Sequence, residues 1–330
     1  CSPSLLHLTV QYCASKKRNF QKMLSALQVI RTVILIVTWP CGTILNSSII
    51  AVYLSDWKKG VKLGECDQIS LSMGCTNLLL QCFITLGVAF ISYGMYLPFA
   101  FSIFLSFWLT AGLSVCYCLR LANPLPKCFL QLKRRLSRIV TPLLLWSVAI
   151  SFTVTFSNII LYTGTNQNLT ILYHNNKSNV NDDYSIPAIT FGISLPSIIT
   201  SICILLSLIS LLRHIRRMKQ NPQVRSPQLK NLIRACRTMF LLMTLNFLFF
   251  LIIFSLMVPL YDVGTVWNMV RSSGIVLIPS GQAVVLIFGN SKLLEKNIFI
   301  FDRIVYRRGK IILPYIYCVK EHYTEKLFVV

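Results

Sequence analysis

Seven stretches of the chain contain no Lys, Arg, Asp or Glu and are long enough to cross a bilayer. A helix needs about 20 apolar residues to span roughly 30 Å of hydrocarbon. The pattern therefore predicts an all-α membrane protein, a bundle of seven transmembrane helices joined by polar segments. The stretches are Thr32–Leu54, Ile69–Ile91, Pro98–Leu119, Ile139–Thr163, Tyr184–Leu212, Thr238–Tyr261 and Ser272–Ser291.

Proline interrupts five of these stretches. Membrane helices tolerate proline and bend there, so each proline marks an expected kink. The prolines concerned are Pro40, Pro142, Pro187, Pro196, Pro259 and Pro279.

The segments between the stretches alternate between those that contain several Lys and Arg residues and those that contain almost none. Segments 55–68, 120–138, 213–237 and 292–330 hold three, six, eight and eight Lys or Arg, whereas segments 92–97, 164–183 and 262–270 hold one, Lys177. Basic loops stay on the cytoplasmic side of a membrane. The pattern therefore predicts an N-terminus outside and a C-terminus in the cytoplasm.

The longest segment assigned to the outside, 164–183, contains two Asn-x-Ser/Thr triplets, at Asn168 and Asn176. Such triplets accept N-linked glycans when they face the lumen, so we expect both to be glycosylated. A similar triplet at Asn46 lies within a predicted span and is discounted.

The chain divides into three parts by composition. Residues 1–22 open with Cys1, carry four basic residues on the side predicted to lie outside and lack the apolar core of a signal peptide. They are expected to have little relevance to a receptor domain over 23–296. Residues 297–330 form a basic tail on the cytoplasmic side.

The overall composition agrees with a membrane protein. Of 330 residues, 55% are hydrophobic and 13% are charged, against about 25% charged in a typical soluble domain. The net charge of +22 is confined to the inter-span segments, so membrane lipid is the expected partner of these charges and nucleic acid is not. The twelve cysteines form no paired metal spacing, and a disulfide framework is not predicted.

The spans lack the groups that catalysis or ion coupling needs. No Asp, Glu, Lys or Arg lies inside any stretch, and none of the four histidines does. Ion-coupled transporters usually carry such groups at the midplane. We therefore expect no enzyme, no cofactor and no metal. Seven helices with this orientation favour a G-protein-coupled receptor by analogy; a non-signalling membrane carrier is the alternative of a different class.

Short motifs at the inner ends of the spans resemble those of the type 2 (bitter) taste receptor family. Trp108 and Leu113 precede YCLRLAN at 117–123 and FLQLKRRL at 129–136. In that family the third span carries a Trp, a Leu five residues later and a Tyr, followed by a basic residue, Ile-Ala-Asn and a loop similar to FLxLKxRI. Further matches are Gly42 with Asn46, SLLRHIRRM at 210–218, the segment 230–238, and PSGQAVVLIFGNSKL at 279–293. The resemblance covers about 23–296 and implies a receptor at the plasma membrane.

The chain departs from the family pattern at three inner positions. Asn77 stands where the family has an arginine, Leu232 where it has a histidine, and Gln282-Ala283 where it has His-Ser. These departures are typical of a divergent member. Type 1 vomeronasal pheromone receptors share the topology but lack the SLxxHxxxM-like and GNxKL-like endings, so they remain the second choice of family.

The resemblance assigns roles to individual residues. Small-molecule agonists are expected on the outer halves of the spans, at Phe99, Ile103, Phe191, Phe250, Ile253, Ser272 and Ile275. Asn46, Asn77 and Gln282 are expected to make inner polar contacts between helices. A heterotrimeric G protein, of the gustducin or inhibitory type that the family implies, is expected to contact Tyr117, Arg120, Lys133, Arg134, Arg135, His214 and Met218.

Overall fold

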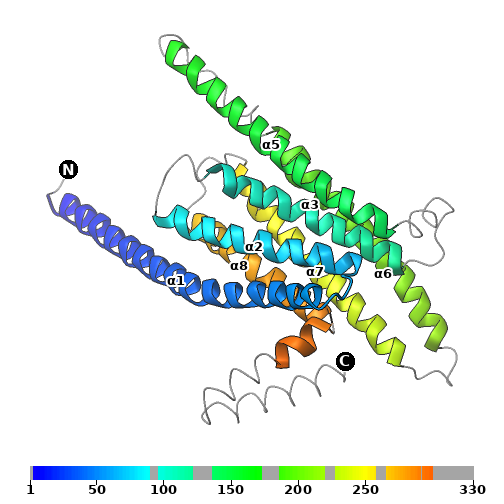
Figure 1. Cartoon of the computed structure of the whole chain (residues 1–330). Helices are drawn as coiled ribbons and strands as arrows, with labels where there is room; N and C mark the ends of the chain where they lie inside the picture. Colours follow the sequence, from blue (N-terminus) through cyan, green and yellow to red (C-terminus); the bar gives the residue numbers. More distant parts are fainter. Residues whose placement is uncertain are drawn as a thin grey trace.

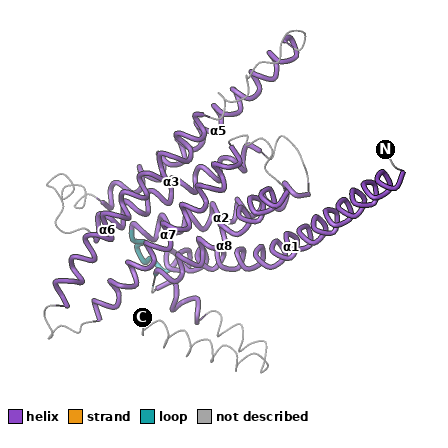
Figure 2. Tube along the Cα trace, turned by 180° about the vertical axis from the view of Figure 1, so that it is seen from behind, coloured by secondary structure: helices purple, strands orange, loops and turns teal. Residues whose placement is uncertain are grey.

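A computed structural model of the chain describes residues 3–89, 96–121, 136–172, 186–219, 227–257, 265–290 and 292–299, and these ranges contain helices but no strand (Figures 1 and 2). The long helices are α1 (Pro3–Lys58), α2 (Glu65–Ala89), α3 (Tyr96–Leu121), α5 (Leu136–Leu172), α6 (Leu195–Lys219), α7 (Pro227–Met257) and α8 (Thr265–Gly289). A π-helical segment η2 (Ala188–Ser194) precedes α6, and a short helix Lys292–Phe299 follows α8.

The helices confirm the expected membrane bundle. Six helices in the described part of the chain are long and apolar enough to cross a membrane. A seventh is added when Ser273–Gly289 and Lys292–Phe299, which meet at an angle of 104°, count as one bent span. Apart from Asn290, the described part of every predicted stretch lies within a helix, because an apolar segment in lipid must satisfy its main-chain hydrogen bonds internally.

Several helices are longer than the sequence pattern predicts; α7, for example, begins at Pro227 rather than at Thr238. α1 begins at Pro3 rather than near Thr32, so residues 3–22, which were expected to have little relevance to the receptor domain, lie on the same helix as the first span. α5 continues to Leu172, although its apolar span ends at Ile160. The apolar pattern marks where a helix leaves the bilayer, not where it stops. Asn168 therefore lies on a helix and not in the expected loop, while Asn176 is outside the described residues.

Helix α3 forms the centre of the bundle. It contacts α2, α5, η2, α6 and α7, and 78% of its membrane span is buried, against 17–44% for the other spans. Figure 1 shows it enclosed between α2 and α5. Helix α8 closes the other side of the bundle by packing between α1 and α7. A substitution on α3 therefore reaches almost every other helix directly.

Hydroxyl groups inside the spans donate to their own helices. Thr110 donates to the Ser106 carbonyl at 2.8 Å and Ser114 to the Thr110 carbonyl at 2.8 Å. Ser151 and Thr155 form the same four-residue contact on α5. This pattern satisfies a hydroxyl without a partner helix, so the many Ser and Thr residues do not oppose burial in lipid.

The turn between α1 and α2 ends α1 with a glycine. Gly60 has a φ of 74°, a conformation that costs glycine little. The Gly60 N–H donates to the Trp57 carbonyl at 2.9 Å and the Val61 N–H to the Asp56 carbonyl at 3.0 Å. These two bonds are the Schellman pattern of helix ends. The acidic residues Glu65 and Asp67 then occupy the first turn of α2, where they complement the positive end of its dipole.

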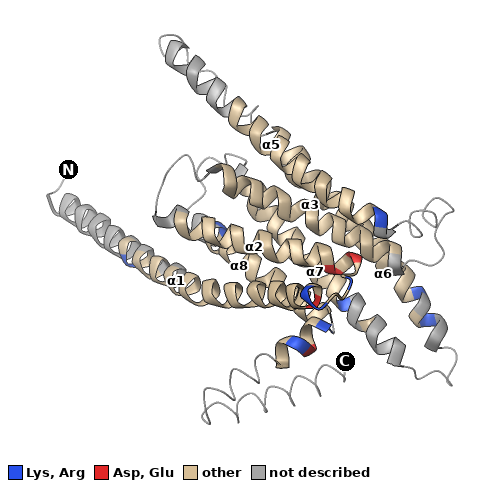
Figure 3. Cartoon of the chain, viewed as in Figure 1, with Lys and Arg blue, Asp and Glu red and all other residues tan. Residues whose placement is uncertain are grey.

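Charged side chains gather mainly at the end of the bundle where α1 ends and α2 begins (Figure 3). The same end holds the last turns of α3 and α6 and the first turns of α5 and α7, since consecutive helices run in alternating directions. We refer to it as the basic end. It is the end that the sequence assigns to the cytoplasm.

The π-helical segment η2 is held by an indole from α3. The Leu195 N–H donates to the Thr190 carbonyl, one residue further back than in an α-helix. Pro196 has no N–H, so the Phe191 carbonyl has no main-chain donor. The Trp108 Nε1–H fills this place at 3.2 Å. The carbonyl of Phe191 before Pro196 thus accepts a hydrogen bond from a side chain of another helix.

Trp108→Phe tests this contact, because it keeps an aromatic ring and removes the N–H. We expect a loss of about 1 kcal/mol in stability, typical of one intramolecular hydrogen bond, seen as a lower apparent melting temperature in detergent. Trp146→Phe is the matched control, since Trp146 is 67% exposed. Equal shifts for the two variants would contradict the assigned role of the Trp108 N–H.

Candidate functional site

Three groups of side chains follow one another along the bundle axis. We call them the outer cluster, the polar layer and the inner ionic cluster. The outer cluster comprises the buried residues Leu80, Ala100, Ile103, Phe104, Phe107, Val154, Ala188, Ile193, Phe249, Ile253 and Ile278. The polar layer comprises Asn46, Asn77, Gln81, Ser106, Ser280 and Gln282. The inner ionic cluster comprises Tyr53, Asp56, Asp67, Asn290, Lys292 and Lys296.

The outer cluster brings together five of the seven residues expected to contact an agonist. Ile103 and Ile253 are buried within it, at 2% and 0% exposure. Phe99, Phe250 and Ile275 are partly buried and pack against it. These five come from α3, α7 and α8, so the structure gathers residues that are remote in sequence into one apolar region.

The remaining two expected residues are Phe191 and Ser272. The Phe191 ring is 54% exposed, while its neighbours Gly192 and Ile193 are buried. Phe191 does not pack against the outer cluster, because the π-helical turn directs its neighbours, not its ring, to the core; its contact with an agonist stays a prediction. Gly192 has to be small, since a Cβ there would approach the Phe104 ring to 2.6 Å. The side chain of Ser272 is outside the described part of the structure.

The polar layer joins α1, α2 and α8. The Asn46 amide donates to the Gly42 carbonyl at 2.9 Å and to the Pro279 carbonyl at 3.3 Å. The Asn77 amide donates to the Asn46 Oδ1 at 3.2 Å. Both residues are fully buried. The asparagine that replaces the family's arginine in α2 therefore has a place in this network.

A parallel connection links the same three helices nearer the outer cluster. Gln81 donates to the Ser280 hydroxyl at 3.4 Å, and Ser280 donates to the Thr38 carbonyl at 3.1 Å. A Cβ on Gly42 would lie 2.0 Å from Gln81 Nε2 and 2.2 Å from Ser280 Oγ. Glycine at this position thus makes room for both polar side chains.

The third polar contact crosses from α8 to the central helix. Gln282 and Ser106 share a hydrogen bond of 3.3 Å. Two amide oxygens of the layer, Asn77 Oδ1 and Gln81 Oε1, are buried and accept no hydrogen bond from the described residues. A buried acceptor without a donor is costly, so the layer has hydrogen-bonding capacity that a different helix arrangement could use.

The inner ionic cluster ties the short helix Lys292–Phe299 to the ends of α1 and α2. The Asp56 carboxylate, with a side chain 5% exposed, forms an ion pair with Lys292 at 2.8 Å and a second with Lys296. Lys292 also lies 3.7 Å from the Asp67 carboxylate. Two carboxylates and two ammonium groups thus meet where the chain turns out of α8.

Asn290 completes this cluster. Its amide donates to the Tyr53 hydroxyl at 3.1 Å and to Asp67 Oδ1 at 3.3 Å, and its oxygen accepts from the Lys292 N–H at 3.1 Å. Sequence reasoning missed the cluster because it counted basic residues alone. A signal was present: Asp56, Glu65 and Asp67 are three of only ten acidic residues, and all lie in segment 55–68, where they balance its three lysines.

The residues expected to contact a G protein are described only in part. Tyr117 is partly buried near the end of α3, and Arg120 occupies the last turn of that helix. His214 and Met218 lie on the last turns of α6. The structure does not describe the side chains of Arg120, His214 and Met218. It describes no part of Lys133, Arg134 and Arg135. The helices thus bring Tyr117, Arg120, His214 and Met218 to the basic end.

The described residues contain no group of three His, Cys, Asp or Glu side chains that could hold a metal. The polar groups are instead paired between helices, an arrangement suited to holding helices in register.

Comparison with known proteins gives one family. The family model described as "Taste receptor protein (TAS2R)" matches residues 23–303. Among curated proteins, taste receptor type 2 member 43 of Papio hamadryas is 29% identical, over 83% of this chain and 93% of its own length. Taste receptor type 2 member 9 of Homo sapiens is 26% identical, over 88% and 100%. Taste receptor type 2 member 40 of Gallus gallus is 28% identical, over 77% and 88%.

Removal of both lysines tests the inner ionic cluster. Lys292→Met or Lys296→Met alone leaves Asp56 one partner and should have a modest effect. The double variant leaves a buried, unpaired carboxylate, which typically costs about 3–5 kcal/mol, so its apparent melting temperature should fall sharply. Adding Asp56→Asn to the double variant should restore most of the loss. Lys59→Met is the control at the same end of the bundle. If the effects of the two single variants simply add up in the double variant, and Asp56→Asn does not restore its stability, the ion pairs of Asp56 do not stabilise the fold.

Proposed function

The chain belongs to the type 2 taste receptor family, and we propose that it binds small bitter molecules on its outer side and activates a heterotrimeric G protein. The observation that carries the proposal is the family match over 23–303, which includes the whole helix bundle from α2 to α8. The family is one of G-protein-coupled taste receptors and not of enzymes, which agrees with the multi-pass helical fold. It also removes the need for the vomeronasal alternative.

We propose that the basic end faces the cytoplasm and that the receptor acts in the plasma membrane. The excess of Lys and Arg in alternate segments supports this orientation. Asn168 then lies on the outer side, eight residues beyond the apolar span of α5, or about 12 Å along the helix. Such a position suits an N-glycan, and we propose one there and at Asn176.

The agonist site that we propose is the edge of the outer cluster, at Phe99, Phe250 and Ile275. These side chains are partly buried against the cluster, so a ligand can reach them without replacing its fully packed centre. The Phe250 ring stacks on Phe254 with ring centres 5.6 Å apart. Apolar and aromatic walls with few polar groups suit small amphipathic ligands. Ile103 and Ile253 lie behind these walls and support them.

Activation is a shift between two helix arrangements. An agonist favours the active arrangement only as far as it binds that arrangement better. The polar layer lies between the outer cluster and the basic end, and its hydrogen bonds join α1, α2, α3 and α8. We assign Asn46, Asn77 and Gln282 the role of setting the balance between the arrangements.

The G protein is proposed to contact the basic end at Tyr117, Arg120, His214 and Met218, together with Lys133, Arg134 and Arg135. Arginine is always charged and donates several hydrogen bonds, which suits carboxylates and carbonyls of a partner. The family implies a G protein of the gustducin or inhibitory type.

A panel of bitter compounds should raise calcium or lower cAMP in cells that display the receptor. For an agonist so identified, Phe250→Ala should raise the half-effective concentration roughly two- to tenfold, since one aromatic contact is worth about 0.5–1.5 kcal/mol. Phe247→Ala is the matched control, because that ring is 57% exposed on the same helix. Full surface display without any response would favour a non-signalling carrier.

Arg120→Ala separates coupling from ligand binding. Loss of a charged hydrogen bond, worth about 1.5–3 kcal/mol, should weaken G-protein activation tenfold or more. Agonist affinity measured without G protein and the surface level should stay unchanged. Intact signalling would assign Arg120 to lipid contact instead, and loss of surface display would make it a structural residue.

Glycosylation tests the orientation. Endoglycosidase treatment should increase the gel mobility of the wild-type protein and should do so less for Asn168→Gln. Asn166→Gln, two residues away and outside any Asn-x-Ser/Thr triplet, should behave like the wild type. An unshifted wild type made in a glycosylating cell would place this segment on the cytoplasmic side.

A further inference from the structure

Two cysteine side chains of neighbouring helices contact each other near the basic end. Cys118 in the last turn of α3 and Cys203 on α6 share a side-chain hydrogen bond. Both are free thiols, and Cys118 is 2% exposed whereas Cys203 is partly exposed. Neither belongs to the outer cluster, the polar layer or the inner ionic cluster. The pair therefore offers a chemistry that the proposed function does not use.

The packing of α3 against α6 places the two cysteines at one level independently of their own contact. The helices pack together and run in the same direction. Nearer the outer end, Trp108 of α3 donates to the carbonyl of Phe191. Cys118 follows Trp108 by ten residues and Cys203 follows Phe191 by twelve. Both cysteines thus lie roughly 15–18 Å further along the same interface.

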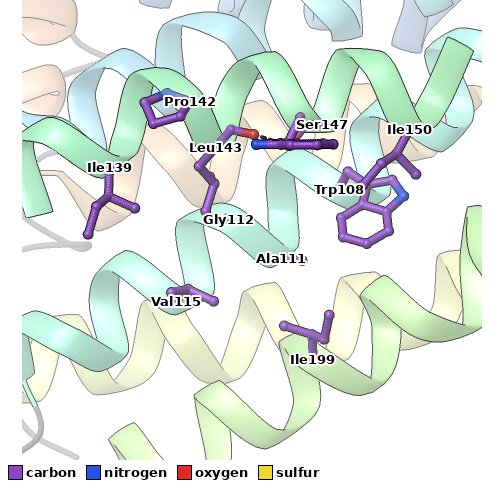
Figure 4. Close-up of a pocket in the computed structure, with 11 residues that line it drawn as sticks. Trp108, Ala111, Gly112, Val115, Ile139, Pro142, Leu143, Ser147, Ile150 and Ile199 are labelled. Carbon is purple, nitrogen blue, oxygen red and sulfur yellow. Dashed lines mark hydrogen bonds between the residues drawn. The ribbon is translucent and has the colours of Figure 1, made fainter. Parts of the chain in front are cut away.

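Figure 4 shows the stretch of α3 and α6 between these two levels. Ile199 of α6 points toward α3, and it lines one pocket together with Ala111 and Val115. Cys203 lies four residues after Ile199, and Cys118 lies three residues after Val115. Each step is about one helical turn. The two thiols therefore continue the face on which the helices already meet.

Ser207 adds a third polar group to the pair. Its hydroxyl donates to the Cys203 carbonyl at 2.7 Å and is a hydrogen-bond neighbour of the Cys118 thiol. Ser207 is fully buried. The thiol of Cys118 is thus held between two groups of α6 and faces the sulfur of Cys203.

We propose that Cys118 and Cys203 form a modification site at which a peroxide creates a disulfide bond between α3 and α6. The reactive form of a cysteine is its thiolate, and the partly exposed Cys203 is the one that a small peroxide reaches. Its sulfur attacks one oxygen of hydrogen peroxide, the O–O bond breaks, and a sulfenic acid and hydroxide form.

The second step joins the two helices. The sulfur of Cys118 attacks the sulfenic acid sulfur of Cys203, the S–O bond breaks, and hydroxide leaves as the S–S bond forms. The two thiol protons and the two hydroxides give two water molecules. Both sulfurs are oxidised and the peroxide is reduced. A small-molecule thiol reverses the reaction by thiol–disulfide exchange, as is usual for the transient disulfides of the reducing cytosol.

The bond joins the two helices that carry four of the proposed G-protein contacts. Tyr117 directly precedes Cys118, and His214 lies further along α6 toward the basic end. A covalent link retains the arrangement in which the two sulfurs meet, whereas an agonist acts by favouring a different one. Oxidation should therefore lower signalling. This consequence rests on the proposed function, whereas the disulfide itself does not.

The test treats the full-length receptor in nanodiscs with hydrogen peroxide, blocks the remaining thiols with N-ethylmaleimide and maps its peptides by mass spectrometry without reduction. A linked peptide that contains Cys118 and Cys203 and lacks two hydrogen atoms should appear, and dithiothreitol should remove it. Cys118→Ser and Cys203→Ser should each abolish it. Cys82→Ser is the control, since it removes an exposed thiol of α2. Oxidation of other cysteines without this linked peptide would overturn the proposal.

Phenylarsine oxide provides a second measurement that needs no oxidation. Its arsenic binds two neighbouring thiols together, so it should protect both cysteines of the wild type from N-ethylmaleimide added in denaturant. In Cys203→Ser the protection of Cys118 should be lost. Equal alkylation of Cys118 with and without the arsenical in the wild type would show that the thiols are not neighbours and would also overturn the proposal.

The effect on signalling is measured separately. The response to an agonist should fall in proportion to the linked fraction of the receptor, and dithiothreitol should restore it. The response of Cys203→Ser should resist peroxide. A linked peptide with an unchanged response would overturn the consequence for signalling. A receptor that forms the linked peptide but answers no bitter compound would contradict the proposed function and leave the disulfide site standing.

Discussion

The hydrocarbon core of a membrane offers no hydrogen-bonding partner, so every polar group in this bundle has to find one inside the protein. The chain meets this requirement in two ways. Hydroxyl groups such as that of Thr110 donate to the carbonyl four residues earlier in their own helix. Amides and indoles instead cross to a neighbouring helix, as Asn77 and Trp108 do. Hydrogen bonds within one helix place no constraint on how that helix packs against its neighbours. Hydrogen bonds between helices fix the distance and the register between them.

This distinction explains the three groups of side chains along the bundle. The outer cluster has few polar groups and holds α3, α7 and η2 together by contacts such as the stack of Phe107 on Phe249, with ring centres 4.6 Å apart. The polar layer fixes α1 and α2 against α8. At the basic end water is close, and full charges such as Asp56 and Lys292 replace amides. The two ends of the bundle therefore differ in their chemistry, while the polar layer between them holds the helices in register.

The sequence was sufficient to predict the spans, because lipid imposes one simple rule on helix length and composition. The sequence also identified Asn46, Asn77 and Gln282 as contacts between helices, because an amide within an apolar span has to find its hydrogen-bond partner inside the protein. The sequence did not predict the parts of α1 and α5 that extend beyond their apolar spans. Lipid does not constrain the composition of a helix that continues into water, so the apolar pattern gives no sign of where such a helix ends. The π-helical turn at Phe191 depends on Trp108 from another helix, and the pair of Asp56 with Lys296 joins residues 240 positions apart. Such features arise only from packing.

The size of the polar contacts limits how the receptor can switch. Interhelical hydrogen bonds in membranes average about 0.6 kcal/mol, so the five helix-to-helix contacts of the polar layer together amount to roughly 3 kcal/mol. Moving a population from almost fully inactive to almost fully active takes about 5.5 kcal/mol. Rearranging Asn46, Asn77 and Gln282 alone is therefore insufficient, even if Asn77 Oδ1 and Gln81 Oε1 gain donors in the new arrangement. Under the proposed function, the larger share comes from repacking the outer cluster around an agonist and from contacts of the basic end with the G protein. The polar layer then sets the free-energy difference between the two states before either of them binds.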